Sequence, residues 1–187
     1  SGKTTFLRKL AASSDGTVMI PARILKVKGF TLKEFIRVSC FRERRIDGRL
    51  TSQGEKAIDE ALDILGLSPL SQRDISTLSD GEFQKASIAA ALVRKADIIL
   101  MDEPTAFLDP FHRSCLMEQL KTLSQRGKSV LCVLHDLPLA LRFSDRIAVM
   151  ERGNLLSLDT PENTLQSGIL TEVFGITMER SENGFYY

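Results

Sequence analysis

This sequence lacks several features of membrane-spanning, nucleic-acid-binding and secreted proteins. Its formal net charge is only +1, so it has no basic excess of the kind that binds nucleic acid. No apolar run approaches the roughly 20 residues that cross a bilayer, and we therefore expect membrane attachment only through a partner. The first residues show no signal-peptide pattern. The three cysteines, Cys40, Cys115 and Cys132, lack metal-ligand spacing, which favours reduced thiols in a cytosolic setting.

The apolar residues are sufficient for one substantial core. The chain has 187 residues, of which 43% are hydrophobic and 26% are charged, so we expect a single domain with room for an inserted lobe. Internal repeats and low-complexity segments are absent from the sequence. Organisation must therefore be inferred from individual motifs.

The most informative stretch is residues 97–109, DIILMDEPTAFLD. Its unbroken apolar run, Ile98 to Met101, predicts a strand that is buried on both faces, and the run ends in Asp102 and Glu103. Open parallel α/β sheets place their ligand chemistry at the carboxyl ends of strands, where an acid pair can handle a cation or a proton. The alternative is a strand that runs into a solvated acidic loop. Taken alone the stretch favours that alternative, but three phosphate-type features elsewhere reverse the balance.

The first of these features is the start of the chain, SGKTT, which matches the end of the phosphate-loop pattern G-x-x-x-x-G-K-[ST] and runs into a predicted helix over residues 6–12. In such a loop, backbone N–H groups bind phosphate, the lysine spans the β- and γ-oxygens, and the next hydroxyl holds Mg²⁺. Lys3 and Thr4 would take the last two roles. Because the first four positions of the pattern are absent, we expect the N-terminal part of the natural protein to be missing.

The other two features are a capped helix and a histidine. Ser79 and Glu82 have the S-x-x-E spacing of a capping box ahead of a predicted Ala-rich helix over residues 83–95. A capped helix N-terminus beside a glycine is also an anion site, and both interpretations hold together. His135 follows the apolar run of residues 130–134, a second predicted buried strand that ends at the same edge of the sheet. A lone histidine is more often structural than catalytic, so His135 indicates a catalytic site only in combination with the other motifs.

In order along the chain, GKTT, LSDGE, LMDEPT, FLD and VLHD resemble the motifs of the ATP-binding cassette (ABC) family, and the resemblance covers nearly the whole chain. Within the family, the chain looks most like the importer ATPases for iron–siderophore complexes, haem and cobalamin. The resemblance implies an ATPase that binds ATP and Mg²⁺. The implied nucleotide-binding residues are Ser1, Gly2, Lys3, Thr4, Thr5, Asp102, Ser79, Gly81 and Asp109, with Thr4 and Asp102 at the metal. Of the implied catalytic residues, Glu103 would polarise the attacking water and His135 would contact the γ-phosphate.

The resemblance also implies an architecture and partners. The fold would be α/β, with a P-loop NTPase-type parallel-sheet core over residues 1–22 and 96–187 and a helical insertion subdomain over about residues 23–95. Two copies would form a dimer of cassettes, in which Ser79 and Gly81 serve the nucleotide on the opposite copy and Asp109 lies in the loop that crosses the dimer. Integral membrane permease subunits and, indirectly, a solute-binding protein would be the other partners, at the cytoplasmic face of the inner membrane. Nucleic acid is not an expected partner.

Two departures from the family pattern favour an alternative function. Where the family has a glutamine after the strand of residues 17–20, this chain reads Pro21-Ala22, which puts the usual coupling to the permease in doubt. LSDGE carries Asp80 and Glu82 where the common form has uncharged residues, and this charge would weaken a closed dimer around a triphosphate unless Lys85 or a cation offsets it. The alternative is a poorly hydrolysing, nucleotide-binding regulatory ABC protein that is not dedicated to transport.

Local signals predict the remaining elements. We expect a helix over residues 55–65 closed by Gly66, a helix that begins at Asp109-Pro110 and ends at Gly127, a hairpin from residues 147–150 and 155–158, and a final helical region from Thr160 to Gly175. The basic segment of residues 23–49 is, on its composition, a solvated charged face. The family resemblance implies instead that this lobe docks a membrane subunit, with Phe30, Phe35 and Phe41 as candidates for the contact. The tail of residues 177–187 has no pattern that predicts structure.

Overall fold

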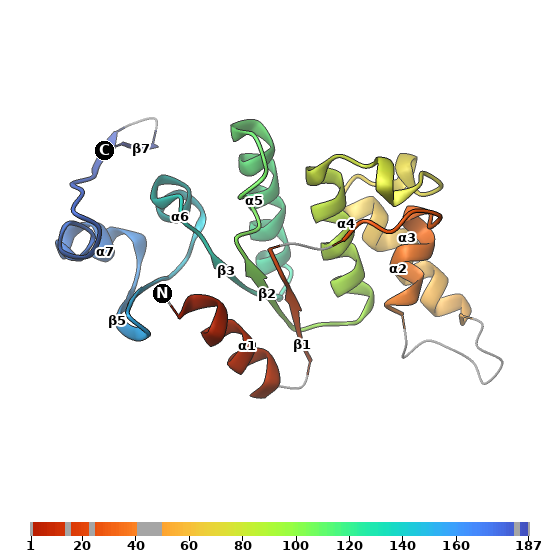
Figure 1. Cartoon of the computed structure of the whole chain (residues 1–187), viewed down its shortest axis with the longest axis horizontal. Helices are drawn as coiled ribbons and strands as arrows, with labels where there is room; N and C mark the ends of the chain where they lie inside the picture. Colours follow the sequence, from red (N-terminus) through yellow and green to blue (C-terminus); the bar gives the residue numbers. More distant parts are fainter. Residues whose placement is uncertain (1, 14–15, 23–24, 41–49, 182–183, 187) are drawn as a thin grey trace.

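The computed structural model describes residues 2–13, 16–22, 25–40, 50–181 and 184–186. At its centre lies a parallel sheet with the strand order β1-β2-β3, made of β1 (Thr17–Ile20), β2 (Ile98–Asp102) and β3 (Ser129–Val133). Figure 1 shows this sheet between a helical lobe on one side and the C-terminal part of the chain on the other. The predicted parallel α/β core is confirmed.

The strand register brings the ends of β2 and β3 together. Asp102 lies opposite Val133, so the residues that follow both strands leave the sheet at the same edge. β2 is the central strand, and Ile99, Leu100 and Met101 are completely buried. Burial on both faces, predicted from the unbroken apolar run, is therefore confirmed.

Three helices belong to this central layer: α1 (Lys3–Ser13) before β1, α5 (Pro110–Gln125) between β2 and β3, and α6 (Leu137–Phe143) after β3. The start of α5 is the predicted one, because the Asp109 side chain accepts a hydrogen bond from the His112 N–H at 2.9 Å and Pro110 stands in the first turn. Its Leu116, Leu120 and Leu123 are buried. This helix therefore packs its apolar stripe inward, as its spacing predicts.

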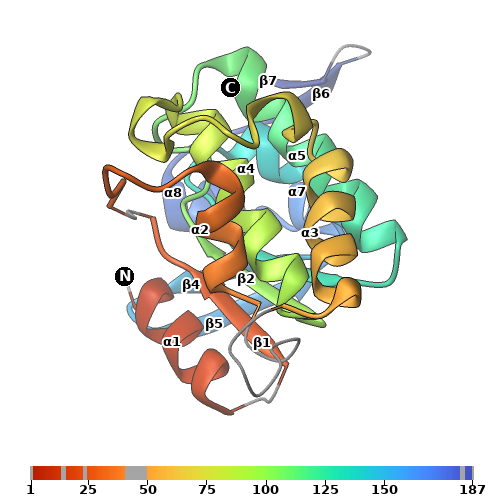
Figure 2. The ribbon, with the colours of Figure 1, turned by 90° about the vertical axis from the view of Figure 1, so that its right-hand side faces the viewer.

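The helical lobe consists of α2 (Leu32–Val38), α3 (Ser52–Ile64), α4 (Asp80–Val93) and 3₁₀ turns at Ser68–Leu70 and Ile75–Thr77. Figure 2 shows α2 and α3 in front of α4 when the lobe faces the viewer. The predicted capping box of Ser79 with Glu82 is formed, and Thr31 with Glu34 forms a second one at the start of α2. Helix α3 begins three residues before its predicted start, because Thr51 caps it by accepting a hydrogen bond from the Gly54 N–H at 3.1 Å.

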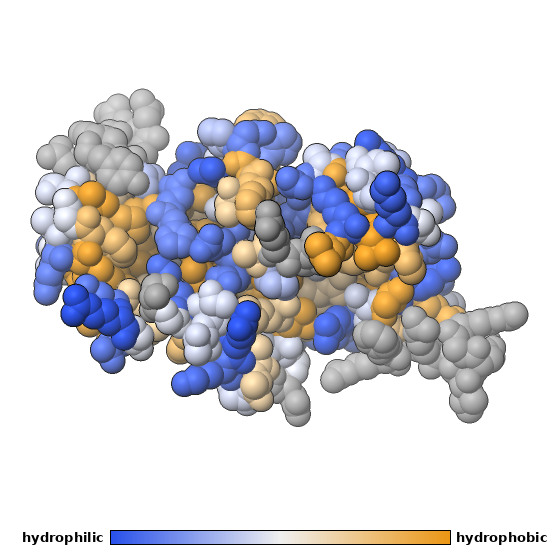
Figure 3. All heavy atoms as spheres, viewed as in Figure 1, coloured by the Kyte–Doolittle hydropathy of each residue, from blue (hydrophilic) through white to orange (hydrophobic). Residues whose placement is uncertain are grey.

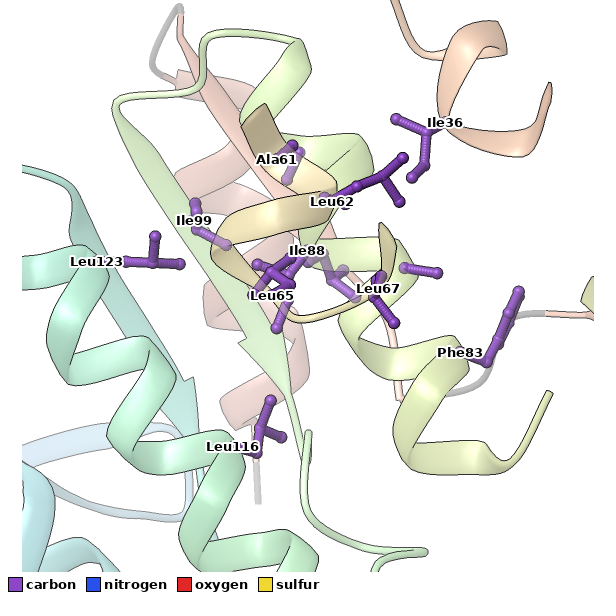
Figure 4. Close-up of a cluster of buried hydrophobic side chains, with 14 of the residues drawn as sticks. Ile36, Ala61, Leu62, Leu65, Leu67, Phe83, Ile88, Ile99, Leu116 and Leu123 are labelled. Atoms are coloured by element: carbon purple, nitrogen blue, oxygen red, sulfur yellow. The ribbon is translucent and has the colours of Figure 1, made fainter. Parts of the chain in front are cut away.

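The lobe and the sheet share one continuous core. Buried side chains from α2, α3, α4, β2 and α5 form a single cluster, part of which Figure 4 shows: Ile36, Ala61, Leu62, Leu65, Leu67, Phe83, Ile88, Ile99, Leu116 and Leu123. Helix α4 lies at its middle, and its Ala86, Ile88 and Ala89 are completely buried. Small side chains along α4 let α2 and α3 approach it from the lobe while the sheet packs from the other side. A shift of α4 would therefore disturb the packing of both the lobe and the sheet.

The C-terminal part differs from its prediction in two places. The hairpin of β4 (Ile147–Glu151) and β5 (Asn154–Asp159) forms as expected. The final helical region, however, is split into α7 (Pro161–Gln166) and α8 (Ile169–Phe174), because Gly168 between them has φ +76°. The tail forms a second hairpin, β6 (Glu179–Ser181) with β7 (Gly184–Tyr186). A separate small cluster that includes Leu141 and Val149 holds this part together.

A cavity of about 620 Å³ lies between the central layer and the hairpin of β4 and β5. Residues of α5, β3, α6 and β4 line it, and Lys3 also contributes to its wall. Figure 3 shows hydrophilic residues interspersed with hydrophobic ones over the visible face. In the part of the chain that the structure describes, no helix combines the length and the apolar composition needed to cross a membrane.

Candidate functional site

Two segments that are 98 residues apart in the sequence meet at Thr4 and Asp102. The Thr4 hydroxyl donates a hydrogen bond to Asp102 Oδ2, with an oxygen–oxygen distance of 2.8 Å. Thr4 lies in the first turn of α1, and Asp102 ends β2 with only 8% of its surface exposed. The hydroxyl predicted to hold Mg²⁺ and the carboxylate implied at the same ion are therefore direct neighbours.

Gly2 has a backbone that other residues rarely adopt. Its φ is +81°, its carbonyl accepts a hydrogen bond from the Phe6 N–H at 2.9 Å, and a Cβ at this position would lie 3.1 Å from the Cα of Gly153 in the β4–β5 turn. Only glycine fits such a conformation and so close a neighbour without strain. The Gly of the predicted phosphate loop thus brings the chain tightly into the first turn of α1.

The other phosphate-loop residues differ in their burial and in their contacts. Lys3 is the first residue of α1 and is half-buried. Thr5 is exposed, and among the described residues no hydrogen bond connects it to the acid pair. Ser1 lies outside the described residues. Gly2, Lys3 and Thr4 thus lead the chain into the contact with Asp102 at the end of β2, whereas Thr5 is exposed.

Glu103 and His135 form a pair at the same edge of the sheet. Glu103 Oε1 lies 2.8 Å from His135 Nε2, and the two side chains are 38% and 64% exposed. Glu103 has φ +49°, and its N–H donates to the Val133 carbonyl at 3.1 Å, which fixes it beside the end of β3. A non-glycine residue held in the left-handed region by its surroundings is characteristic of functional sites. The pair predicted from separate motifs is brought together and remains open to solvent.

A cavity of about 500 Å³ opens beside this pair, lined by Glu103, Thr105, Ala106, Arg113, His135, Asp136 and Pro138. Arg113 was not singled out from the sequence. Its Nε donates to the Leu108 carbonyl at 2.7 Å, and its guanidinium lies 3.5 Å from Asp136. Asp136 in turn caps α6 by accepting a hydrogen bond from the Leu139 N–H at 3.0 Å. Arg113 therefore connects the loop before α5 to the residue after His135.

The Thr4–Asp102 pair has the chemistry of a Mg²⁺ site. Asp102 Oδ1 is buried and has no hydrogen-bond partner among the described residues, an arrangement that is unfavourable unless a ligand completes it. A hard cation that prefers oxygen ligands satisfies such an atom. Within the described segments, no group of three or more His, Cys, Asp or Glu side chains could hold a metal. Mg²⁺ would therefore take its remaining ligands from phosphate and water, as it does when only one or two carboxylates bind it.

Ser79, Gly81 and Asp109 belong to a second location, where the starts of α4 and α5 meet. A Cβ at Gly81 would lie 3.5 Å from Leu108 and 3.7 Å from His112, so these two helix starts are in contact. Asp109 caps α5, and the N–H and ring of His112 beside its carboxylate lower the pKa of Asp109. Among the described residues, no hydrogen bond or ion pair joins Ser79 or Gly81 to the Thr4–Asp102 pair. The predicted site is thus divided within one copy of the chain.

The charge on LSDGE is offset by a residue that the sequence did not single out. Lys26, rather than the predicted Lys85, supplies the counter-charge, because its Nζ lies 2.8 Å from Asp80 Oδ1. The other carboxylate, Glu82, accepts hydrogen bonds within its capping box, and the N–H of Ser79 lowers the pKa of Glu82. Both carboxylates therefore have partners inside the lobe.

The predicted docking residues differ in accessibility. The Phe35 ring packs into the core with its centroid 5.5 Å from that of Phe83, and Arg37 pairs with Glu55 at 2.8 Å. Phe30 is 42% exposed, whereas Phe41 lies outside the described residues. Phe35 and Arg37 therefore serve the lobe itself, and Phe30 is the better candidate for an external contact.

Comparison with known proteins identifies the family of this chain. A family model described as ABC transporter matches residues 1–106. The chain belongs to the ABC transporter family. ATP-binding proteins of this family are ATPases, and the match covers both the Gly2–Thr4 loop and the Asp102–Glu103 pair.

Individual relatives of this ABC protein are import subunits. It is 34% identical over 179 residues to the petrobactin import ATP-binding protein FpuC of Bacillus anthracis, a match that covers 95% of this chain and 66% of the relative. It is 36% identical to the hemin import ATP-binding protein HmuV of Rhodococcus jostii over 68% of this chain and 44% of the relative. A second HmuV, from Rhodopseudomonas palustris, is 33% identical over 95% of this chain and 75% of the relative. The chain thus spans about half to three quarters of the length of these proteins.

A solved structure agrees with the fold. A metal-chelate type ABC transporter in an inward-facing conformation superposes with a TM-score of 0.86 over 99% of this chain and 79% of that one, at 21% identity. At this level of identity the likeness supports the fold alone. The P-loop ATPase architecture predicted from the sequence is confirmed by it.

Proposed function

We propose that this chain is the ATP-hydrolysing subunit of an importer that takes up a metal chelate, namely an iron–siderophore complex, haem or cobalamin. The observation that carries the proposal is the meeting of Thr4, Asp102, Glu103 and His135 at one edge of the sheet. These residues come from three separate motifs, GKTT, LMDEPT and VLHD, and each has the side chain that ATP hydrolysis requires. A bound cation would supply the partner that Asp102 Oδ1 lacks among the described residues.

Each residue has a part in the reaction. Lys3 and the N-terminal N–H groups of α1 would bind phosphate oxygens, and Thr4 and Asp102 would hold Mg²⁺. When bound, Mg²⁺ neutralises the charge that develops on the β- and γ-phosphate oxygens. The Glu103 carboxylate orients the attacking water and accepts its proton, and the hydrogen bond from His135 fixes that carboxylate. His135 is exposed enough to contact a γ-phosphate as well.

A second copy completes the site. Ser79 and Gly81 lie apart from Thr4 and Asp102 within one copy, so they are available to the nucleotide bound by another. The first turn of α4 points its free N–H groups at that nucleotide. Asp109, at the start of α5, lies next to this turn through His112 and so belongs to the same interface.

The choice of cargo and of the other partners follows from the relatives. Proteins of similar sequence are import ATP-binding proteins for petrobactin, hemin and iron(3+)-hydroxamate. We infer that this chain works with integral membrane permease subunits and, through them, with a solute-binding protein, at the cytoplasmic face of the membrane. The predicted core over residues 1–22 and 96–187 then carries the hydrolytic residues, and the helical subdomain over about residues 23–95 supplies the docking surface together with Ser79 and Gly81.

The alternative, a poorly hydrolysing regulatory protein, is favoured by Ala22, which cannot relay a polar contact to the permease. Its second argument, the charge of Asp80, is weakened by the ion pair with Lys26. The complete gene product, reconstituted with its permease in proteoliposomes, separates the two functions. We expect ATP hydrolysis that the permease stimulates and uptake of one of the three cargo classes. Turnover that stays low and does not respond to the permease would establish the regulatory protein instead.

A further inference from the structure

Lys26 lies at the start of α4, the helix that follows the LSDGE signature motif, although it is more than 50 residues away from it in the sequence. Its ammonium donates to the Leu78 carbonyl at 2.7 Å and to Asp80 Oδ1 at 2.8 Å, on either side of Ser79. The same ammonium lies 5.6 Å from the centre of the Phe83 ring. Three contacts of a cation with a carbonyl, a carboxylate and a buried ring hold one side chain in place.

The segment that carries Lys26 is attached along its length to the residues before α4. The Gly29 N–H donates to Asp74 Oδ2 at 2.8 Å, and the Phe30 carbonyl accepts a hydrogen bond from the Ile75 N–H at 2.9 Å. Thr31 and Asp74 then form an isolated antiparallel bridge. Residues 26–31 therefore form a strap across residues 74–80, and Lys26 is its contact nearest to Ser79.

The position of Asp80 explains why a cation is needed there. Asp80 is in the first turn of α4, where a carboxylate stabilises the helix but repels any phosphate brought to the same N-terminus. Its side chain is 63% exposed, so its charge would face such a phosphate. Lys26, at 25% exposure, is the more buried partner and supplies the opposite charge at contact distance.

We propose that Lys26 is a positioning residue of the ATPase, which fixes the Leu78–Asp80 turn and cancels the charge of Asp80 so that Ser79 and Gly81 can accept a phosphate from the opposite copy. This inference rests on the proposed function. It also gives the strap a role, since a displacement of residues 26–31 by a docked permease changes the turn that carries Ser79.

The test compares four variants of the complete gene product: Lys26→Met, Lys26→Arg, Lys26→Met combined with Asp80→Asn, and Lys33→Met. Lys33 is a matched control, because it pairs with Asp59 at 2.6 Å with exposures of 23% and 59%, in the same lobe but away from the signature turn. Lys26→Met should lower ATP turnover at limiting protein concentration about tenfold, the value of one hydrogen bond to a charged group. Lys26→Arg and the double variant should stay within threefold of wild type, as should Lys33→Met.

Hydrogen exchange at the amides of residues 80–83 provides a readout that does not require hydrolysis. Lys26→Met should exchange these amides faster than wild type, and Lys33→Met should not. Unchanged exchange, or an equal loss of turnover with and without Asp80→Asn, would overturn the role of Lys26. If the wild type itself hydrolyses no ATP while exchange responds as expected, the proposed function fails and the positioning of the turn by Lys26 stands.

Discussion

The carboxylates at the sheet edge and those in the helical lobe have different surroundings. In the lobe, Glu34 and Glu82 close capping boxes and Asp80 pairs with Lys26. At the sheet edge, Asp102 keeps one buried oxygen without a partner among the described residues, and Glu103 is held in a left-handed backbone conformation. The lobe satisfies its acids internally, whereas the sheet edge leaves Asp102 Oδ1 without a partner among the described residues and pairs Glu103 with a solvent-exposed histidine.

This difference separates structural acids from functional ones. A capping carboxylate gains its hydrogen bonds when the helix forms, so it needs no ligand. A buried carboxylate oxygen without a donor costs free energy that only a bound cation or donor recovers. Substitutions at the edge should therefore affect chemistry with little effect on folding, and substitutions of the capping carboxylates Glu34 and Glu82 in the lobe should do the opposite. Substitutions at the two locations can test this division between functional and structural acids.

The largest effect is expected for Glu103→Gln. The amide keeps the shape of the side chain but cannot accept a proton, so turnover should fall by roughly 10² to 10⁴ while ATP still binds. Steady-state hydrolysis and nucleotide titration of the complete gene product measure the two properties. Glu118→Gln, an exposed change on α5, is the control and should leave both unchanged. Hydrolysis within threefold of wild type in Glu103→Gln would remove Glu103 from the reaction.

Asp102→Asn should have the next largest effect, on Mg²⁺ rather than on folding. Loss of one charge-assisted contact corresponds to about 1.5 to 3 kcal/mol, or roughly ten- to hundredfold in the Mg²⁺ concentration needed for half-maximal nucleotide binding. The unfolding midpoint should change little, because the Thr4 hydroxyl can still donate to the remaining oxygen. Mg²⁺ titrations monitored with a fluorescent nucleotide check this, and an unchanged Mg²⁺ requirement would contradict the assignment of Asp102.

Local signals were sufficient to predict much of the fold and the site. The strand Thr17–Ile20, the cap at Asp109 and the capping box at Ser79 all depend on residues close together in sequence, and all are confirmed. The meeting of Thr4 with Asp102 was predictable because the phosphate-loop pattern and the family resemblance assign both residues to one Mg²⁺ ion. The phosphate-loop motif and the acid pair thus each strengthened the interpretation of the other as part of a nucleotide site.

Contacts that depend on loops were not predictable in the same way. Lys26 stands in a segment without periodicity, and nothing near it in the sequence indicates that Asp80 lies beside it. The packing of Phe35 on Phe83 has the same origin, since an aromatic residue in a basic segment has no local sign of burial. Gly168 interrupts the last helical region through a backbone conformation that its neighbours do not indicate. Tertiary context decides each of these positions.

Ser79→Ala tests the boundary between the two kinds of site, because Ser79 both caps α4 and is expected to reach the opposite nucleotide. Thr31→Ala is the matched control, since Thr31 has the same capping geometry on α2. Each substitution should lower the free energy of unfolding by about 1 kcal/mol in urea denaturation. Only Ser79→Ala should also lower ATP turnover, by about tenfold for a lost hydrogen bond to phosphate. Equal turnover in the two variants would show that Ser79 is structural alone.

The smallest effect is expected for Glu82→Gln, and it should depend on pH. The hydrogen bond from the Ser79 N–H lowers the pKa of Glu82 below its ordinary value of 4.5, so the ionised form stabilises the folded state. That stabilisation is complete above pH 4.5 and disappears as the pH falls through the lowered pKa of the folded protein. At pH 7 the variant should therefore be less stable than wild type by about 0.3 to 1.5 kcal/mol, a normal value for one element of a helix cap. Urea denaturation at pH 7, 4 and 3 measures this difference in the free energy of unfolding, which should shrink as the pH falls. A difference that stays constant across these pH values would mean that the cap does not depend on the charge of Glu82.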